Sequence, residues 1–219
     1  MTKITVQTDS GKIRIKLHDE AKAPVVTGPT GVEPLESSKP VATNSKALLL
    51  PTRLINLMEI RAESGFRPNE EDVEIVYALS GSVPNTPDML HKLSSQTVVE
   101  KAAEDHVISS VRGMIEHIIK ERSSPPRLVV GVHTHPQGVP KPSDKDNRYF
   151  RNAFGTIKSL VPEAYVLFGV HAISSESIRE RLEPTKISRN AIKWSSITRE
   201  HEIAFYTPES NTYEVKLVE

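Results

Sequence analysis

Two histidines and an aspartate, close together in the chain, are the side chains best suited to do chemistry as a group. His133 and His135 directly follow an apolar run, residues 128–132, that is typical of a buried β-strand. Because side chains alternate across a strand, both imidazoles point to the same face, where they can reach one metal ion. The spacing therefore predicts a metal site at the end of this strand.

A helix after the strand supplies the third candidate ligand, Asp146. Apolar residues at helical spacing indicate that the helix begins near Ser143, which places Asp146 in its first turn, on the inward side. Three protein ligands leave the fourth tetrahedral position of a zinc ion to water, as in catalytic sites. The chain has no cysteine, so any zinc must use histidine and carboxylate ligands. We expect one zinc ion per chain at His133, His135 and Asp146, the only closely spaced ligand set in the sequence.

Each fragment also has a structural interpretation without a metal. The His-x-His pair could end a strand as two half-buried histidines, and Ser143 with Asp146 could form a helix capping box. The combination favours the metal site, because both fragments flank a seven-residue, proline-bearing spacer directly after a buried strand.

The same residues resemble a known signature. HTHP at 133–136, then SDKD at 143–146, is similar to the H-x-H-x7-S-x-x-D motif of the JAMM (MPN-plus) metalloproteases. The preceding LVVG resembles the corresponding strand of the proteasome-lid deubiquitinase, and KPSDKD looks like small archaeal JAMM proteins. Thr134 replaces the serine that the family usually has between its histidines.

The family also has a catalytic glutamate on an earlier strand. Residues 72–81, DVEIVYALSG, are similar to its E-x-x-G/A-x-L-x-G pattern, which places the glutamate at Glu74, seven residues before Gly81. Tyr77 stands where the family has a small residue, so we expect a large ring near the site. The fallback candidates for the base are Glu59, Glu70 and Glu71.

The resemblance, which covers about residues 47–219, implies a fold and an activity. The fold would be α/β (α+β), an MPN/JAMM domain with a mixed central sheet flanked by helices. Zinc would lower the pKa of a bound water from about 15.7 to roughly 7, Glu74 would shuttle the proton, and Ser143 would hydrogen-bond the oxyanion. The substrate would be ubiquitin or a ubiquitin-like modifier in a conjugate or precursor, with the proteasome or another MPN protein as a further partner.

Two other functions stay open at this point. Some MPN domains have lost their ligands and act as scaffolds or dimerisation subunits, although the five expected residues are present here. A peptidase of the same fold could instead act on a sulfur-carrier protein. Nucleic-acid and membrane-surface binding are not expected, because 28 basic and 28 acidic residues give no net charge. Without a signal peptide or an apolar span, we expect a soluble, cytoplasmic protein.

Around this centre, the pattern predicts the elements that must position it. Residues 82–97 should be an irregular, mobile insertion that captures an extended substrate tail, and 174–190 a second insertion or short helix. We interpret His171 as a structural histidine with satisfied hydrogen bonds, and His106 and His117 as surface or packing residues. The predicted helices are 51–64 and 99–122, and the predicted strands are 72–80, 165–173, 191–197 and a closing hairpin of 203–206 with 213–218.

The N-terminus is predicted to be a separate module. Residues 3–8 and 12–17 alternate apolar and polar around a turn, which indicates a β-hairpin extension spanning 1–20. Residues 21–46 are rich in proline and small polar residues and are predicted to be a linker. The catalytic domain would then be 47–219.

Overall fold

The structure is a computed structural model in which residues 3–9, 12–18, 47–65, 74–93, 104–174 and 180–219 are described. The chain divides into two units, Met1–Ala42 and Thr43–Glu219. In the first unit, β1 (Lys3–Asp9) and β2 (Lys12–His18) pair antiparallel. The predicted hairpin is therefore confirmed, while the predicted linker, 21–46, lies outside the described residues.

The second unit is built on a mixed seven-stranded sheet with strand order β5-β4-β6-β7-β10-β9-β8. The central pair, β6 and β7, runs parallel, and every other neighbouring pair runs antiparallel. The strands are β4 (Val76–Gly81), β5 (Met89–Lys92), β6 (Leu128–Pro136), β7 (Tyr165–Ile173), β8 (Leu182–Lys186), β9 (Ala191–Ser195) and β10 (Glu200–Tyr206).

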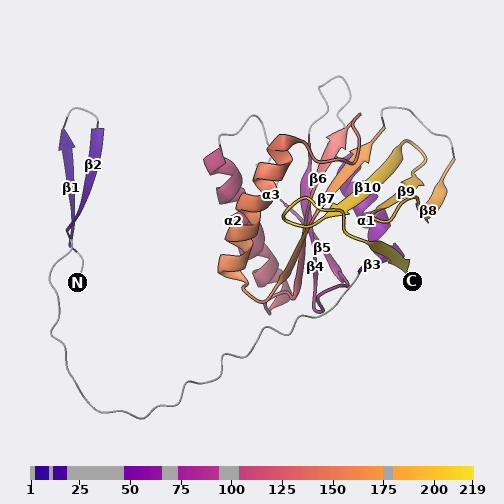
Figure 1. The fold of residues 1–219 in the computed structure, drawn as a ribbon, viewed down its shortest axis with the longest axis horizontal. Coiled ribbons are helices and arrows are strands. Elements are labelled where there is room, and N and C mark those ends of the chain that lie inside the picture. The colour runs from indigo at the N-terminus through magenta and orange to yellow at the C-terminus, as the bar shows by residue number, and fades with distance from the viewer. Residues whose placement is uncertain (1–2, 10–11, 19–46, 66–73, 94–103, 175–179) are drawn as a thin grey trace, which may run out of the picture. The chain divides into compact units, whose positions relative to one another are not determined.

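Helices cover the two faces of this sheet (Figure 1). Helices α2 (Glu104–Arg122) and α3 (Asp144–Leu160) pack on one face, and α1 (Thr52–Glu63) packs on the other. Alternation along β6 divides its apolar residues between the two cores: Val129 faces α2 and α3, whereas Val130 and Val132 face α1. The chain is thus a mixed α/β protein with a three-layer arrangement around its central strands.

Four sequence expectations need correction. Segment 82–97 is not wholly irregular, because β5 lies within it and pairs with β4. The region 174–190, predicted to be a second insertion or short helix, contains the edge strand β8 in its described part, so the helix alternative is wrong. Strand β4 begins at Val76, so Glu74 precedes the strand.

The predicted closing hairpin is also wrong. Tyr206 and Thr212 form a single antiparallel bridge, but β11 (Val215–Val218) then pairs in parallel with β3 (Leu48–Pro51). The alternating pattern of β11 identified a strand without identifying its partner, because β3 lies at the other end of the domain sequence. None of the helices in the described part of the chain is long and apolar enough to span a membrane.

Candidate metal centre

Strand β6 brings the two candidate histidines together on the face that α2 and α3 cover. His133 and His135 lie two residues apart on the strand, and their Nε2 atoms are 3.0 Å apart. His133 packs against Phe150 of α3, with ring centroids 6.1 Å apart. The predicted convergence of the two imidazoles is therefore present.

Helix α3 places Asp146 against the same two nitrogens. Its Oδ1 lies 3.1 Å from His133 Nε2, and its Oδ2 lies 3.5 Å from His135 Nε2. Ligand atoms about 2.0–2.1 Å from a tetrahedral zinc lie roughly 3.3 Å from one another, so this spacing fits a zinc ion. The donor types fit as well, because imidazole nitrogen and carboxylate oxygen are ordinary zinc ligands.

The start of α3 explains why Asp146 is held so firmly. Ser143 is the N-cap and accepts a hydrogen bond from the Asp146 backbone N–H, while Asp146 Oδ2 accepts from the Ser143 backbone N–H at 2.7 Å and from Ser143 Oγ at 2.6 Å. The capping box and the metal-site geometry are thus both present, and they share one carboxylate.

The loop between β6 and α3 fixes His135. Its Nδ1 lies 3.1 Å from the carbonyl oxygen of Val139, to which it can donate, leaving the Nε2 lone pair directed at the site. Tyr206 Oη donates to the carbonyl of Pro140 at 2.6 Å and ties the loop to β10. A Cβ at Gly138 would lie 2.8 Å from the Cβ of His135, so this turn needs glycine.

Glu74 lies at the mouth of the site, just before β4. The backbone N–H of the next residue, Ile75, donates to Thr134 Oγ1 at 2.8 Å, and the Thr134 N–H donates to the Ile75 carbonyl. Val76 pairs with His133, so extending this register by two residues sets Glu74 opposite His135. The Glu74 side chain is exposed, which differs from the expected position on an apolar face.

Charge at the site favours an ionised carboxylate. Burial alone raises the pKa of Asp146, but hydrogen bonds from His133 and His135 outweigh it and hold that pKa well below its usual value. Hydrogen bonding to Asp146 raises the pKa of His135, and the charge of Glu74 adds to this shift. A metal cation would replace the positive charge that a proton on His135 supplies.

Tyr77 does not crowd the site, contrary to expectation. It lies on the opposite face of β4, is fully buried, and its Oη is 2.9 Å from His171 Nδ1. Alternation sends Tyr77 away from the face that carries His133. Among the fallback bases, Glu59 accepts a hydrogen bond from Trp194 Nε1 on the α1 face, and Glu70 and Glu71 lie outside the described residues.

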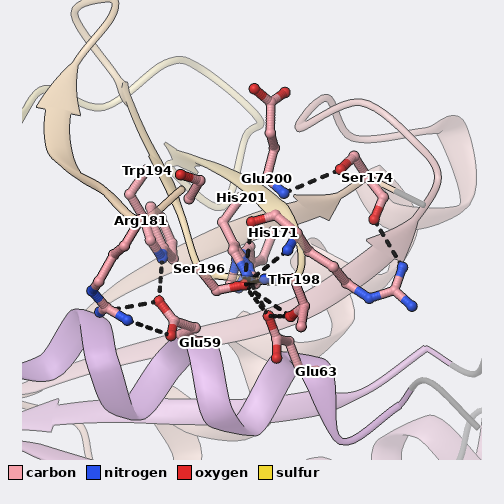
Figure 2. A network of polar contacts seen from close by, with 12 residues as sticks. Glu59, Glu63, His171, Ser174, Arg181, Trp194, Ser196, Thr198, Glu200 and His201 are labelled. Atoms are coloured by element: carbon pink, nitrogen blue, oxygen red, sulfur yellow. Dashed lines mark hydrogen bonds and ion pairs between the residues drawn. The ribbon is translucent and has the colours of Figure 1, made fainter. Parts of the chain in front are cut away.

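The α1 face carries a separate network of histidines (Figure 2). His171 Nε2 lies 3.1 Å from His201 Nδ1, and His201 Nε2 lies 3.1 Å from Glu63 Oε1. Both histidines are fully buried, and every ring nitrogen has a protein partner. The interpretation of His171 as a structural histidine is confirmed.

A second group of metal-binding residue types was missed by the sequence reasoning. His91, His117 and Glu121 place their ligand atoms within 4.8 Å of one another, so the first group is not the only closely spaced set. The i,i+4 spacing of His117 and Glu121 was a visible signal, whereas His91 is brought to them by the pairing of β5. No protein-family model matches this chain, and no curated protein matches it.

Proposed function

We propose that this chain is a zinc-dependent isopeptidase or peptidase of the JAMM (MPN-plus) type, which removes ubiquitin or a ubiquitin-like modifier from conjugates or processes its precursor. The observation that carries the proposal is the convergence of His133, His135 and Asp146 at one point, with Glu74 at its mouth. A site made only for structure would enclose its metal with a fourth protein ligand.

The chemistry of an amide bond suits these groups. Zinc held by His133, His135 and Asp146 would act as a Lewis acid and make water acidic enough to ionise near neutral pH. Glu74, exposed and opposite His135, accepts a proton from the attacking water and delivers it to the leaving amine. Ser143 Oγ, which donates a hydrogen bond to Asp146 here, would instead donate one to the developing oxyanion.

The edge of the sheet suits the tail of a ubiquitin-like protein. Strand β5 is the last strand on its side of the sheet and follows β4, the strand next to Glu74. An extended peptide can add to such an edge through main-chain hydrogen bonds, without demanding particular side chains. We therefore replace the expected mobile insertion with a preformed edge strand as the place where the tail pairs.

The test is cleavage of ubiquitin-like conjugates and linear fusions by the full chain, with and without a chelator. We expect cleavage that the chelator abolishes and added zinc restores. Glu74→Gln should keep its zinc and lose activity by on the order of 10²–10⁴, because only the proton shuttle is removed. Glu163→Gln, an exposed glutamate in the turn before β7, is the matched control and should be fully active.

Two outcomes would contradict the proposal. A zinc-loaded chain that cleaves none of these substrates would point instead to a scaffold role. Full activity of Glu74→Gln would show that Glu74 is not the general base.

A further inference from the structure

We propose that His91, His117 and Glu121 bind a second divalent metal ion, with zinc as the best match to their chemistry, and that this ion fastens the edge strand β5 to helix α2. The three residues take no part in the proposed reaction. They lie on two elements, so a bound ion would link the edge of the sheet to the helix that covers it.

His91 is the buried part of the group. It pairs with Ala78 on β4, whose side chain lies in the core beneath α2 and α3, so His91 faces the same layer. It is fully buried on a strand of only four residues, whose first and last residues, Met89 and Lys92, are exposed. A histidine is an unusual choice for such a core position, because a buried imidazole needs polar partners.

Helix α2 supplies the two other ligands from one side. His117 and Glu121 are four residues apart and therefore neighbours on the helix surface. Glu121 Oε2 lies 2.5 Å from His91 Nδ1, and Glu121 Oε1 lies 3.2 Å from His117 Nε2. Both imidazoles thus aim at one carboxylate, whose side chain is 42% exposed and has room to move outward around an ion.

Ser80 and Arg122 hold the far side of the His91 ring. Ser80 Oγ lies 2.7 Å from His91 Nε2, and Arg122 Nη1 donates to Ser80 Oγ at 2.9 Å. A histidine that binds a metal through one ring nitrogen usually bonds an oxygen through the other, which fixes the ring. Ser80 is such a partner, because its oxygen has two lone pairs and can accept from both Arg122 and His91.

The order Ser80, His91, Glu121 is also that of a Ser-His-acid triad, but that chemistry does not fit the burial. Ser80 and His91 are both fully buried, so a substrate carbonyl cannot reach the hydroxyl. A metal ion can approach from the side of His117 and Glu121, which are 41% and 42% exposed. On binding, the His91 ring proton moves to Nε2, which donates a hydrogen bond to Ser80 Oγ, and Nδ1 presents its lone pair to the ion.

The experiment separates this site from the first one. In the full chain, His133→Ala with His135→Ala disables the first site, and this double variant should still hold one zinc per chain by elemental analysis. Adding His117→Ala should weaken the remaining zinc binding by at least about tenfold. The matched control is Arg112→Ala, an exposed residue on the same helix whose ion pair with Glu116 is 3.9 Å long, and it should leave binding unchanged.

A second readout uses stability instead of metal content. Zinc added to the metal-free double variant should raise its unfolding temperature, and the rise should disappear with His117→Ala. The proposal is overturned if the folded double variant binds no zinc, or if His117→Ala binds it as tightly as its parent. Neither result depends on cleavage of any substrate, so failure here would leave the proposed function standing.

Discussion

The two faces of the central sheet each carry a group of two histidines and one acidic residue, and the two groups are arranged differently. On the α3 face, the Nε2 atoms of His133 and His135 meet at one point beside Asp146. On the α1 face, His171 and His201 are joined end to end and lead to Glu63 (Figure 2). Tyr77 Oη bonds the other end, at His171 Nδ1. Composition alone therefore does not distinguish a metal centre from a structural network.

The difference lies in where the ring nitrogens point and in access to solvent. At the first group, a backbone carbonyl occupies His135 Nδ1, which leaves Nε2 of that ring for a ligand. The side chains of His135 and Asp146 keep 17% and 16% of their surface exposed, so an ion can enter. In the group of His171, His201 and Glu63, both imidazole rings are fully buried and each ring nitrogen is already hydrogen-bonded, so an ion would have to displace protein partners.

The largest expected effects come from breaking one histidine in each group. In a His117→Ala background, His133→Ala should lower bound zinc from one ion per chain to none, with a modest change in the free energy of unfolding of the metal-free protein. His171→Phe should keep the zinc and lower that free energy by about 1–3 kcal/mol for each buried group left unpaired, Tyr77 Oη and His201 Nδ1.

Elemental analysis and urea unfolding of the metal-free proteins measure the two effects. The comparison fails if His171→Phe loses zinc, or if His133→Ala binds it as the parent does. The His117→Ala parent, treated in the same way, is the reference for both quantities.

This contrast also explains what the sequence could predict. The first group comes from a strand, a loop and a helix that follow one another, so period-two and helical spacing were enough to bring His133, His135 and Asp146 together. Glu63, Tyr77, His171 and His201 come from α1, β4, β7 and β10, and only the strand order places them side by side. The expected zinc at the first group stays a prediction.

Two residues, His91 and Tyr77, were misplaced for different reasons. The pattern of β5 was too short to be recognised as a strand, so His91 could not be brought to His117. Gly81 is the last residue of β4, where a Cβ would lie 2.2 Å from the Thr86 carbonyl oxygen. Tyr77 was nevertheless expected near the site, although alternation from Val76, the partner of His133, sends it to the other face.

An intermediate effect should appear in the pH dependence of stability. Burial lowers the pKa of His171 well below its usual value, and burial lowers that of His201 despite its contact with Glu63. The unfolded chain therefore takes up protons below about pH 6.5 that the folded chain does not, so stability is lost as the pH falls from there. The free energy of unfolding falls by at most about 1.4 kcal/mol per pH unit for each histidine.

Urea unfolding of metal-free wild type and His171→Phe at several pH values between 5 and 7.5 would measure this dependence. We expect the free energy of unfolding of the wild type to fall more steeply with decreasing pH than that of the variant. The raised pKa of His135 acts in the opposite direction in both proteins, so it cancels from the difference. Parallel curves would show that the buried network does not govern this loss of stability.

The smallest effect is expected from removing the N-terminal unit, which neither histidine group uses. A chain that begins at residue 47 keeps β3, whose Leu48 and Leu50 are fully buried and which pairs with β11. Its zinc content should equal that of the full chain, and its free energy of unfolding should match to within about 0.5 kcal/mol, because no described element of the domain is lost.

A chain that begins at residue 52 is the matched control: it lacks β3, uncovers the apolar face of α1, and should be strongly destabilised. Urea unfolding and elemental analysis of both truncations would decide it. If the chain from residue 47 is also destabilised, the hairpin belongs to the folded core, and the contrast between the two faces of the sheet must include it.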